Sequence, residues 1–394
     1  MTTYPFPNRE FFNNFKNNTY TLDLLMPKAD ETILEIDLNA LDSNYKYLSS
    51  KIDPGTKIMA VIKAYAYGSD AVAIAKELEN LNADYFAVAY TGEGVTLRNE
   101  NIRTPIMVLH SMPINFDEII DRCLEPSIYS RKIMAEFISA AERKNQTNYP
   151  IHLKFNTGLN RLGFDSTDIP FIAQELAKTK GVKVKSIFSH LAASEDSREQ
   201  DFTQGQIHSF INMVNTLIPK IGYRPLLHCT NTSGILNYPE AHFDMVRTGI
   251  GLYGFGNDPK ENVHLKPIST LKTVISQIHT VQKGQSIGYN RGYFAEKITK
   301  SATLPIGHAD GIPRSYGKGK GWVTINGQKA HILGNVCMDM IMVDVTDIDC
   351  EEGDEVIVFG PTAPADELSA AIKSISYELI TAISQRVKRK IVRK

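Results

Sequence analysis

Short apolar runs alternate with helical stretches from residue 32 onward, and this rhythm constrains the fold more than any other feature. Stretches such as Asp70–Leu81, Ser130–Arg143 and Ile169–Lys178 have the i, i+3, i+4 apolar spacing of amphipathic helices. The first run, Thr32–Leu38, is set aside. Eight runs then follow as predicted strands: Lys57–Ala64, Tyr85–Tyr90, Pro105–His110, Pro126–Tyr129, Ile151–Asn156, Val184–Leu191, Pro225–Asn231 and Met245–Gly249. Alternating strands and helices indicate a parallel sheet covered on both faces. Eight repeats favour a closed (β/α)8 TIM barrel, with a doubly wound open sheet as the alternative.

The pattern changes after about residue 268, where β-branched runs follow one another with turns between them. Asn326-Gly327 separates two such runs and is a strong signal for a type I′ hairpin. A helical stretch, Ala365–Val387, comes last. We therefore expect an N-terminal extension at 1–30, an α/β barrel at 31–268 and a mostly β C-terminal domain at 269–394.

Composition limits the partners and the compartment. The chain of 394 residues has 43 basic and 44 acidic side chains, a formal net charge of -1, which gives no basic face for nucleic acid. No apolar stretch approaches the roughly 18 residues needed to span a membrane. The first ten residues lack the pattern of a signal peptide, and the four cysteines are too scattered for a disulfide framework. We expect a cytoplasmic protein without nucleic-acid or membrane partners.

Lys63 is the first candidate for chemistry. It closes the run Ile58–Ile62, which is typical of a strand buried on both faces. In a barrel this position lies at the C-terminal mouth, where active sites gather. Burial there lowers the pKa of an amine and favours the neutral form that Schiff-base chemistry needs. The commoner alternative for such a residue is a lysine that extends its amine into solvent.

Gly249–Gly254 (GIGLYG) formally matches the dinucleotide motif G-x-G-x-x-G, so a nicotinamide oxidoreductase is one alternative. That motif requires a following helix and an acidic residue about 20 positions later. Phe255–Pro259 instead has the composition of a loop, and Val263–Phe294 contains no Asp or Glu. We therefore interpret the glycines as a phosphate-binding turn after the last barrel strand.

Two further polar segments end predicted strands: Lys154–Arg161 (KFNTGLNR) and Ser189–Leu191 (SHL). With Lys63 they would share one rim of the barrel. Metal chemistry has little support, because H-E-x-x-H, paired C-x-x-C and EF-hand patterns are absent from the sequence. A fourth candidate, Tyr289 in SIGY, is on its own an ordinary amphipathic side chain.

Taken together and in order, these motifs resemble one family over residues 32–392, the fold-type III pyridoxal-phosphate enzymes and specifically the bacterial alanine racemases. The motifs that carry the resemblance are AVIKAYAYG (60–68), KFNTGLNRLGF (154–164), SHLA (189–192), HCTNTSG (228–234), VRTGIGLYG (246–254), SIGYNRGY (286–293), LPIGHADGIPRS (304–315) and NVCMDMIMVDVTD (335–347).

The resemblance implies two-base racemisation of L-alanine and D-alanine, which supplies D-alanine for peptidoglycan. Lys63 would carry pyridoxal 5'-phosphate and act on the D isomer, while Tyr289 acts on the L isomer from the opposite face. His190 matches the residue that contacts this tyrosine. Arg247 matches the arginine that faces the pyridine nitrogen. Its permanent charge disfavours protonation of that nitrogen and weakens the electron sink, which restrains side reactions.

The resemblance also implies how the cofactor phosphate is held: by Tyr67, Thr232, Tyr377 and the backbone around Gly249 and Ile250.

The remaining implied contacts concern the substrate. Arg161 would reach the cofactor's phenolic oxygen and the substrate carboxylate, and Lys154 matches an often carbamylated lysine that orients it. The Met338 backbone N–H would be a second carboxylate contact, with Asp339 adjacent. Tyr289 and Met338 enter the site from the other subunit in this family, which implies a homodimer with composite sites.

The chain departs from the family pattern at five positions. Tyr65 replaces the usual Asn, Asn156 the usual Asp, Thr232 the usual Ser and Thr248 the usual Pro. His308 stands where a tyrosine near the substrate entrance is usual, so serine or another small amino acid stays open as an additional substrate.

Two alternatives share parts of this resemblance. An amino-acid decarboxylase has the same two domains, but Tyr289 and the HADG motif argue against it. A non-catalytic pyridoxal-phosphate carrier resembles the barrel alone, and the complete C-terminal domain argues against that.

Overall fold

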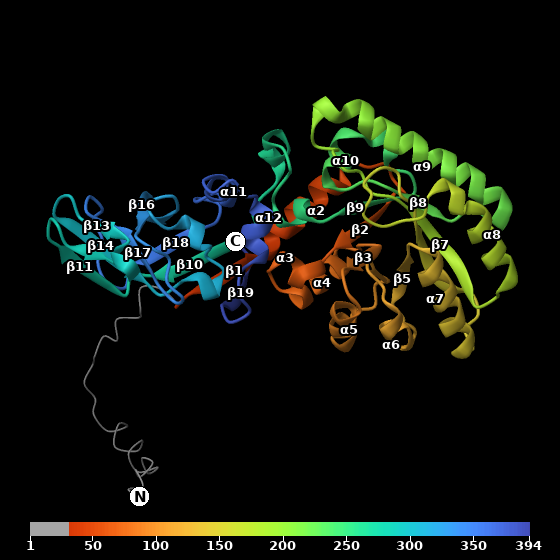
Figure 1. Ribbon diagram of the computed structural model, residues 1–394, viewed down its shortest axis with the longest axis horizontal. Helices are drawn as coiled ribbons and strands as arrows, with labels where there is room; N and C mark the ends of the chain where they lie inside the picture. Colours follow the sequence, from red (N-terminus) through yellow and green to blue (C-terminus); the bar gives the residue numbers. More distant parts are fainter. Residues whose placement is uncertain (1–30) are drawn as a thin grey trace, which may run out of the picture.

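The computed structural model describes residues 31–394, so the predicted extension at 1–30 lies outside the described residues. Two bodies stand side by side, a helix-covered barrel and a second, strand-rich body (Figure 1).

The barrel consists of eight parallel strands in the order β8-β7-β6-β5-β4-β3-β2-β9. The ends of this sheet meet, because the Asp244 backbone N–H donates to the Leu227 carbonyl at 3.1 Å. This confirms the TIM barrel and excludes the open sheet. The strands are β2 (Lys57–Val61), β3 (Tyr85–Val88), β4 (Ile106–Val108), β5 (Glu125–Ile128), β6 (Tyr149–Lys154), β7 (Val182–Phe188), β8 (Leu226–His228) and β9 (Met245–Thr248).

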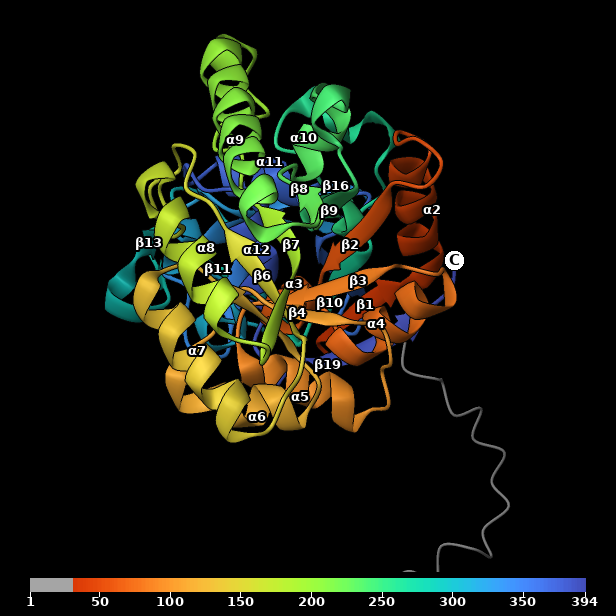
Figure 2. The ribbon, with the colours of Figure 1, turned by 90° about the vertical axis from the view of Figure 1, so that its right-hand side faces the viewer.

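Helices surround the barrel strands (Figure 2). The three amphipathic predictions are confirmed as α4 (Ala71–Asn80), α7 (Arg131–Arg143) and α8 (Ile169–Lys178). Asp70 and Ser130 cap the first two, each accepting a backbone N–H of the first turn. The other helices around the barrel are α2 (Leu38–Ser49), α5 (Thr91–Asn99), α6 (Phe116–Asp121), α9 (Gln200–Ile221) and α10 (Thr232–Asn237).

The second body is a nine-stranded sheet in the order β11-β14-β17-β16-β15-β18-β10-β1-β19. The predicted hairpin at Asn326-Gly327 is confirmed, since both residues have the positive φ angles, 48° and 77°, of a type I′ turn. A two-stranded ribbon, β12 (Ser286–Ile287) and β13 (Tyr293–Phe294), stands beside it. The main strands are β10 (Ser269–Val274), β11 (Gln277–Val281), β14 (Thr299–Leu304), β15 (Trp322–Ile325), β16 (Gln328–Leu333), β17 (Ile341–Asp344), β18 (Glu355–Phe359) and β19 (Lys388–Val392).

Strand β1 (Ile33–Asp37) lies in this second sheet, although it falls within the range 31–268 that we assigned to the barrel. It pairs antiparallel with β10 and parallel with β19, so the first and last described strands lie side by side. From β1 onward, the described chain therefore passes from the second body into the barrel through α2 and later returns.

The predicted helix Ala365–Val387 is wrong as a single element. The structure has two short helices, α11 (Ala365–Ala370) and α12 (Ser376–Thr381), followed by β19. Lys373 between them has φ +59°, a left-handed conformation that an α-helix cannot contain.

The segment α3 (Lys63–Tyr67) is a left-handed turn rather than an α-helix. Four consecutive residues, Ala64 to Tyr67, have φ angles between 52° and 55°. Such residues cost roughly 1–2 kcal/mol each, so the surroundings must hold them. The Glu93 carboxylate does so by accepting the backbone N–H groups of Ala64, Ala89 and Tyr90 at 2.5, 2.7 and 3.0 Å.

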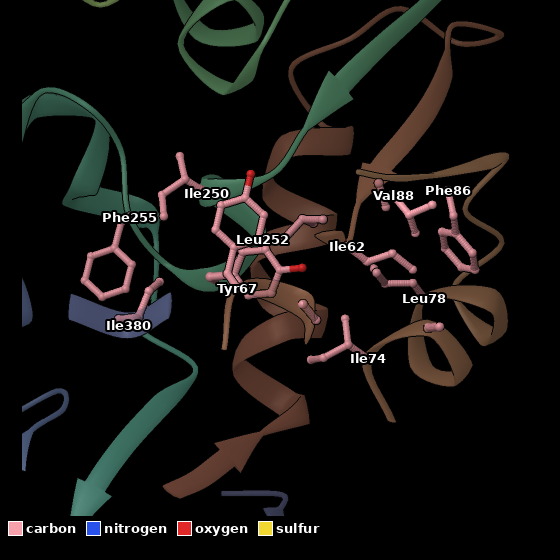
Figure 3. Close-up of a cluster of buried hydrophobic side chains, with 14 of the residues drawn as sticks. Ile62, Tyr67, Ile74, Leu78, Phe86, Val88, Ile250, Leu252, Phe255 and Ile380 are labelled. Atoms are coloured by element: carbon pink, nitrogen blue, oxygen red, sulfur yellow. The ribbon is translucent and has the colours of Figure 1, made fainter. Parts of the chain in front are cut away.

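Helix α12 packs against this turn from the second body. Figure 3 shows Tyr67 among apolar side chains of the barrel body, with Ile380 of α12 close by. Gly68, at φ +82°, ends the turn, and a Cβ there would meet the Ile380 carbonyl oxygen at 2.1 Å.

Gly68→Ala therefore tests how tightly the two bodies are joined. We expect it to lower the free energy of unfolding by about 2–5 kcal/mol, the sum of left-handed strain and overpacking against backbone. Gly222→Ala is the matched control, because Gly222 has φ +78° and open space around it. Chemical denaturation of both variants measures the difference; an equal loss in the two would contradict the contact.

Candidate active site

A cavity of about 660 Å³ opens at the C-terminal ends of the barrel strands. Ten of the residues predicted for the site line it, including the backbone positions Gly249 and Ile250. The complete lining is Val61, Lys63, Tyr67, Ala89, Tyr90, Leu109, His110, Lys154, Arg161, Leu162, Phe188, His190, Asn231, Thr232, Arg247, Gly249, Ile250, Asn257 and Tyr377.

The cavity is strongly cationic. Lys63, Lys154, Arg161 and Arg247 line it, and within residues 31–394 no aspartate or glutamate does. Burial, followed by the charge of Arg161, lowers the pKa of Lys63, although Glu93 opposes this shift. Burial and then Arg161, Arg247 and Lys63 lower the pKa of Lys154 to about 8. Both amines are thus displaced toward the neutral, nucleophilic form.

Arg247 is 4% exposed and sits on β9. Its guanidinium donates to the Ser189 and Cys229 carbonyls at 2.7 and 3.2 Å and to His228 Nδ1 at 2.7 Å. In the described part of the chain none of its hydrogen-bond partners is a carboxylate. Burial lowers its pKa to about 10, so it stays charged at neutral pH.

His190 depends on Arg247 for its tautomer. The guanidinium faces His190 Nδ1 at 3.1 Å. Because arginine only donates, Nδ1 accepts, and the imidazole proton is on Nε2. Burial and then Arg247 lower the pKa of His190 well below its ordinary value, so the ring is a neutral donor. Its Nε2–H is available to a group entering the cavity.

One corner of the cavity collects hydroxyl groups and glycine backbone. Tyr67 stacks on Tyr253 with ring centres 4.4 Å apart, and Tyr377 of α12 donates to Asn257 at 2.9 Å. Burial raises the pKa of Tyr67 and of Tyr377, so these two side chains remain protonated donors. Thr232 lies at the start of α10 and accepts the Gly251 backbone N–H at 3.2 Å. A Cβ on Gly249 would meet the Tyr67 hydroxyl at 2.3 Å, so close approach requires glycine there.

The other predicted residues lie away from the cavity of their own chain. Tyr289, His308, Met338 and Asp339 belong to neighbouring loops of the second body, and none of them lines the cavity. Asn335 donates to the Tyr289 carbonyl at 2.9 Å, and the His308 N–H donates to the Cys337 carbonyl at 2.9 Å. Tyr289 and Met338 are 74% and 59% exposed. The structure thus brings the predicted residues together as two separate groups.

Sequence reasoning missed several lining residues, namely Tyr90, His110, Asn231 and Asn257. It also missed the buried polar residues behind Arg247. His152 is two positions before Lys154 on β6, and residues two apart on a strand share a face. That spacing could have identified it.

Metal-ligand clusters are absent from residues 31–394: no three His, Cys, Asp or Glu side chains are arranged to hold an ion. In the same part of the chain no helix is both long and apolar enough to cross a membrane.

Comparisons with known proteins give a consistent result. Residues 36–257 match a family model described as alanine racemase, N-terminal domain, and residues 268–391 match the C-terminal domain model. The chain is 35% identical to alanine racemase 1 of Clostridium acetobutylicum over 365 residues, which covers 90% of this chain and 94% of that protein.

Solved structures agree with the sequence matches. An alanine racemase from Streptomyces lavendulae superposes with a TM-score of 0.87 at 29% identity, covering 93% of this chain and 98% of that one. One from Bartonella henselae, described with covalently bound pyridoxal phosphate, gives a TM-score of 0.84 at 29% identity and covers 92% and 100%.

The depressed pKa of Lys154 predicts a pH-dependent stability difference. The buried ammonium is penalised below pH 8, and the penalty disappears as pH rises from about 8 to the ordinary value of 10.5, because the unfolded chain then binds the extra proton. Lys154→Met should therefore gain stability relative to the parent protein at pH 7 and lose that gain at pH 10. Denaturation of both apoproteins in CO₂-free buffer measures it. A difference that is the same at both pH values would contradict the burial of a charged amine.

Proposed function

The chain belongs to the alanine racemase family, and from this premise we propose that it interconverts L-alanine and D-alanine with pyridoxal phosphate held in the barrel cavity. The observation that carries the proposal is the cationic cavity around Lys63, which four basic side chains and no described carboxylate line.

The cavity has the donor set that this cofactor needs. Its phosphate would meet the hydroxyls of Tyr67, Thr232 and Tyr377 and the glycine-containing backbone at Gly249 and Ile250. Lys63 supplies an amine with a lowered pKa for the covalent linkage. Arg247 supplies a charged guanidinium for the ring nitrogen. When bound, pyridoxal phosphate withdraws electrons from the substrate's α-carbon and acidifies its proton.

Two groups of this chain would move the proton. The Lys63 amine acts from the barrel side, on the D isomer, and the Tyr289 hydroxyl acts on the L isomer from the partner subunit. The phenol has an ordinary pKa of about 10 and needs a donor to stabilise its anion. The neutral His190, with its proton on Nε2, is such a donor. The exposed Tyr289 is consistent with a role in another chain's cavity.

Substrate selection would combine both groups of residues. Arg161 lines the cavity and attracts the substrate carboxylate, and the Met338 backbone N–H, beside Asp339, is the second contact. Burial and then Arg161 lower the pKa of Lys154 to about 8, which raises the fraction of neutral amine that carbamylation by CO₂ requires, and the product would orient Arg161. His308, adjacent to the Met338 loop, would shape the entrance and admit serine or another small amino acid.

We further assign the product to peptidoglycan synthesis in the cytoplasm, on the strength of the family alone. A decarboxylase is disfavoured because Tyr289 and Met338 are exposed together on one pair of loops. A racemase requires a second proton-transfer group and a contact for the substrate carboxylate, and these two residues would supply them.

Mixed dimers test the composite site. Lys63→Ala should lose covalent cofactor attachment, and Tyr289→Phe should keep the cofactor but lose most racemisation. Unfolding and refolding an equal mixture of the two variants should restore about one quarter of wild-type activity, because half of the dimers are mixed and each has one intact site. Circular dichroism of alanine follows the reaction.

Each variant refolded alone is the control for this experiment. If the mixture stays as inactive as the separate variants, Lys63 and Tyr289 do not meet across a subunit boundary. If Tyr289→Phe alone racemises at the wild-type rate, the two-base assignment is wrong.

A further inference from the structure

A line of polar side chains crosses the barrel interior from Glu125, at the start of β5, to Arg247 near the end of β9. His152 Nε2 lies 2.8 Å from Glu125 Oε2, and His152 Nδ1 lies 2.6 Å from Ser186 Oγ. Ser186 Oγ lies 2.9 Å from His228 Nε2, and His228 Nδ1 lies 2.7 Å from Arg247. The three central side chains are fully buried. We refer to these five residues as the relay.

The two ends of the relay fix a proton position on each histidine. Arginine can only donate, so His228 accepts on Nδ1 and has its proton on Nε2. That proton is donated to Ser186, whose own hydroxyl is then free to donate to His152 Nδ1. His152 is left with a proton on Nε2, which it donates to the Glu125 carboxylate. His228 is therefore a neutral Nε2–H tautomer, and His152 carries a proton on Nε2.

Burial explains why Arg247 needs these partners. A buried cation without a counter-charge is costly, and the other acceptors of Arg247 are two carbonyls and His190. Within the relay, His228 Nδ1 accepts from the guanidinium, and the opposite end is the carboxylate of Glu125. Phe188 adds an aromatic face: it stacks on His228 at 5.1 Å and lies 5.5 Å from the guanidinium carbon.

We propose that Glu125, His152 and Ser186 are positioning residues that orient Arg247 and stabilise its charge from inside the barrel. The role of Arg247 toward the cofactor ring rests on the proposed function; the relay itself rests on the geometry of the barrel. Hydrogen bonds in series polarise one another, so a change of charge at Glu125 is transmitted to His228 only while Ser186 connects them.

The wild-type holoenzyme provides the first test. In protein labelled with ¹⁵N-histidine, the resonances of His228 should be those of a neutral Nε2–H imidazole at neutral pH, because burial and then Arg247 lower its pKa well below the ordinary value, and the Nε2 of His152 should carry a proton. Single His→Gln variants assign the resonances. A cationic ring or an Nδ1–H tautomer at His228 overturns the relay, as does a His152 ring without a proton on Nε2.

Substitutions at Glu125 and at Ser186 provide the second test. Glu125→Gln keeps a hydrogen-bond acceptor but removes the charge. In the wild-type background this substitution should shift the His228 nitrogen resonances. In the Ser186→Ala background the same substitution should leave those resonances unchanged. Ser186→Thr should behave as wild type because it keeps the hydroxyl. Equal shifts with and without the Ser186 hydroxyl overturn the proposal, as does the absence of any shift.

Activity of the same proteins shows whether the positioning matters. Ser186→Ala should lower kcat by about tenfold, by analogy with the loss when a group that orients a metal ligand is removed, with little change in KM, and Ser186→Thr should restore it. Ser127→Ala is the matched control, because Ser127 is an equally buried serine on β5 whose hydroxyl has no hydrogen-bond partner among residues 31–394. A loss in Ser127→Ala as large as in Ser186→Ala would mean that only packing was disturbed.

The two kinds of failure are distinguishable. If the tautomers and shifts are as expected but no alanine is racemised, the relay stands and the proposed function fails. If alanine is racemised but the tautomers differ, the function stands and the relay is wrong.

Discussion

Burial of positive charge at the mouth of the barrel is the constraint on which the rest of the structure depends. Arg247 is almost inaccessible to solvent, and Lys63, Lys154 and Arg161 share its cavity without an acidic lining residue among those described. Such a cluster is unfavourable unless neutral acceptors, distant carboxylates or an anionic ligand offset it. The fold supplies neutral acceptors, which are carbonyls and histidines, and a distant carboxylate, which is Glu125. The anionic ligand would be the cofactor phosphate and the substrate carboxylate that we propose for the cavity.

The second constraint is the strained turn that follows Lys63. Four left-handed residues place Tyr67 beside Gly249 and leave Lys63 at the cavity wall. Glu93 holds the turn from the barrel side, and α12 covers it from the second body. The same two elements contribute to the site itself, since Glu93 acts on the pKa of Lys63 and α12 provides Tyr377. Packing between the two bodies and the geometry of the site are therefore linked.

The sequence predicts the barrel well because its strands are buried on both faces and separated by capped helices, which leaves short apolar runs between clear breaks. It predicts the second body less well. Strand β1 joins that sheet through pairing with β19, a contact across more than 350 residues of sequence that no local pattern encodes. The break between α11 and α12 depends on a left-handed lysine, Lys373, a residue type without a turn preference.

The site shows the same division. Residues at strand ends, such as Lys63 and Lys154, could be placed from the pattern because parallel strands bring their ends together. Tyr289 and Met338 could be assigned a role only through resemblance, and their exposure in a single chain is what the proposed composite site requires. The relay behind Arg247 escaped prediction because Glu125, Ser186 and His228 come from different strands, and their meeting depends on the closure of the barrel.

Chemical trapping of the cofactor tests the central claim most directly. Reduction of the purified holoenzyme with borohydride, followed by digestion and mass spectrometry, should find a pyridoxyl group on the peptide that contains Lys63 and on no other lysine. Attachment to Lys154 or to a lysine outside the cavity, or a holoenzyme without any reducible linkage, would contradict the account.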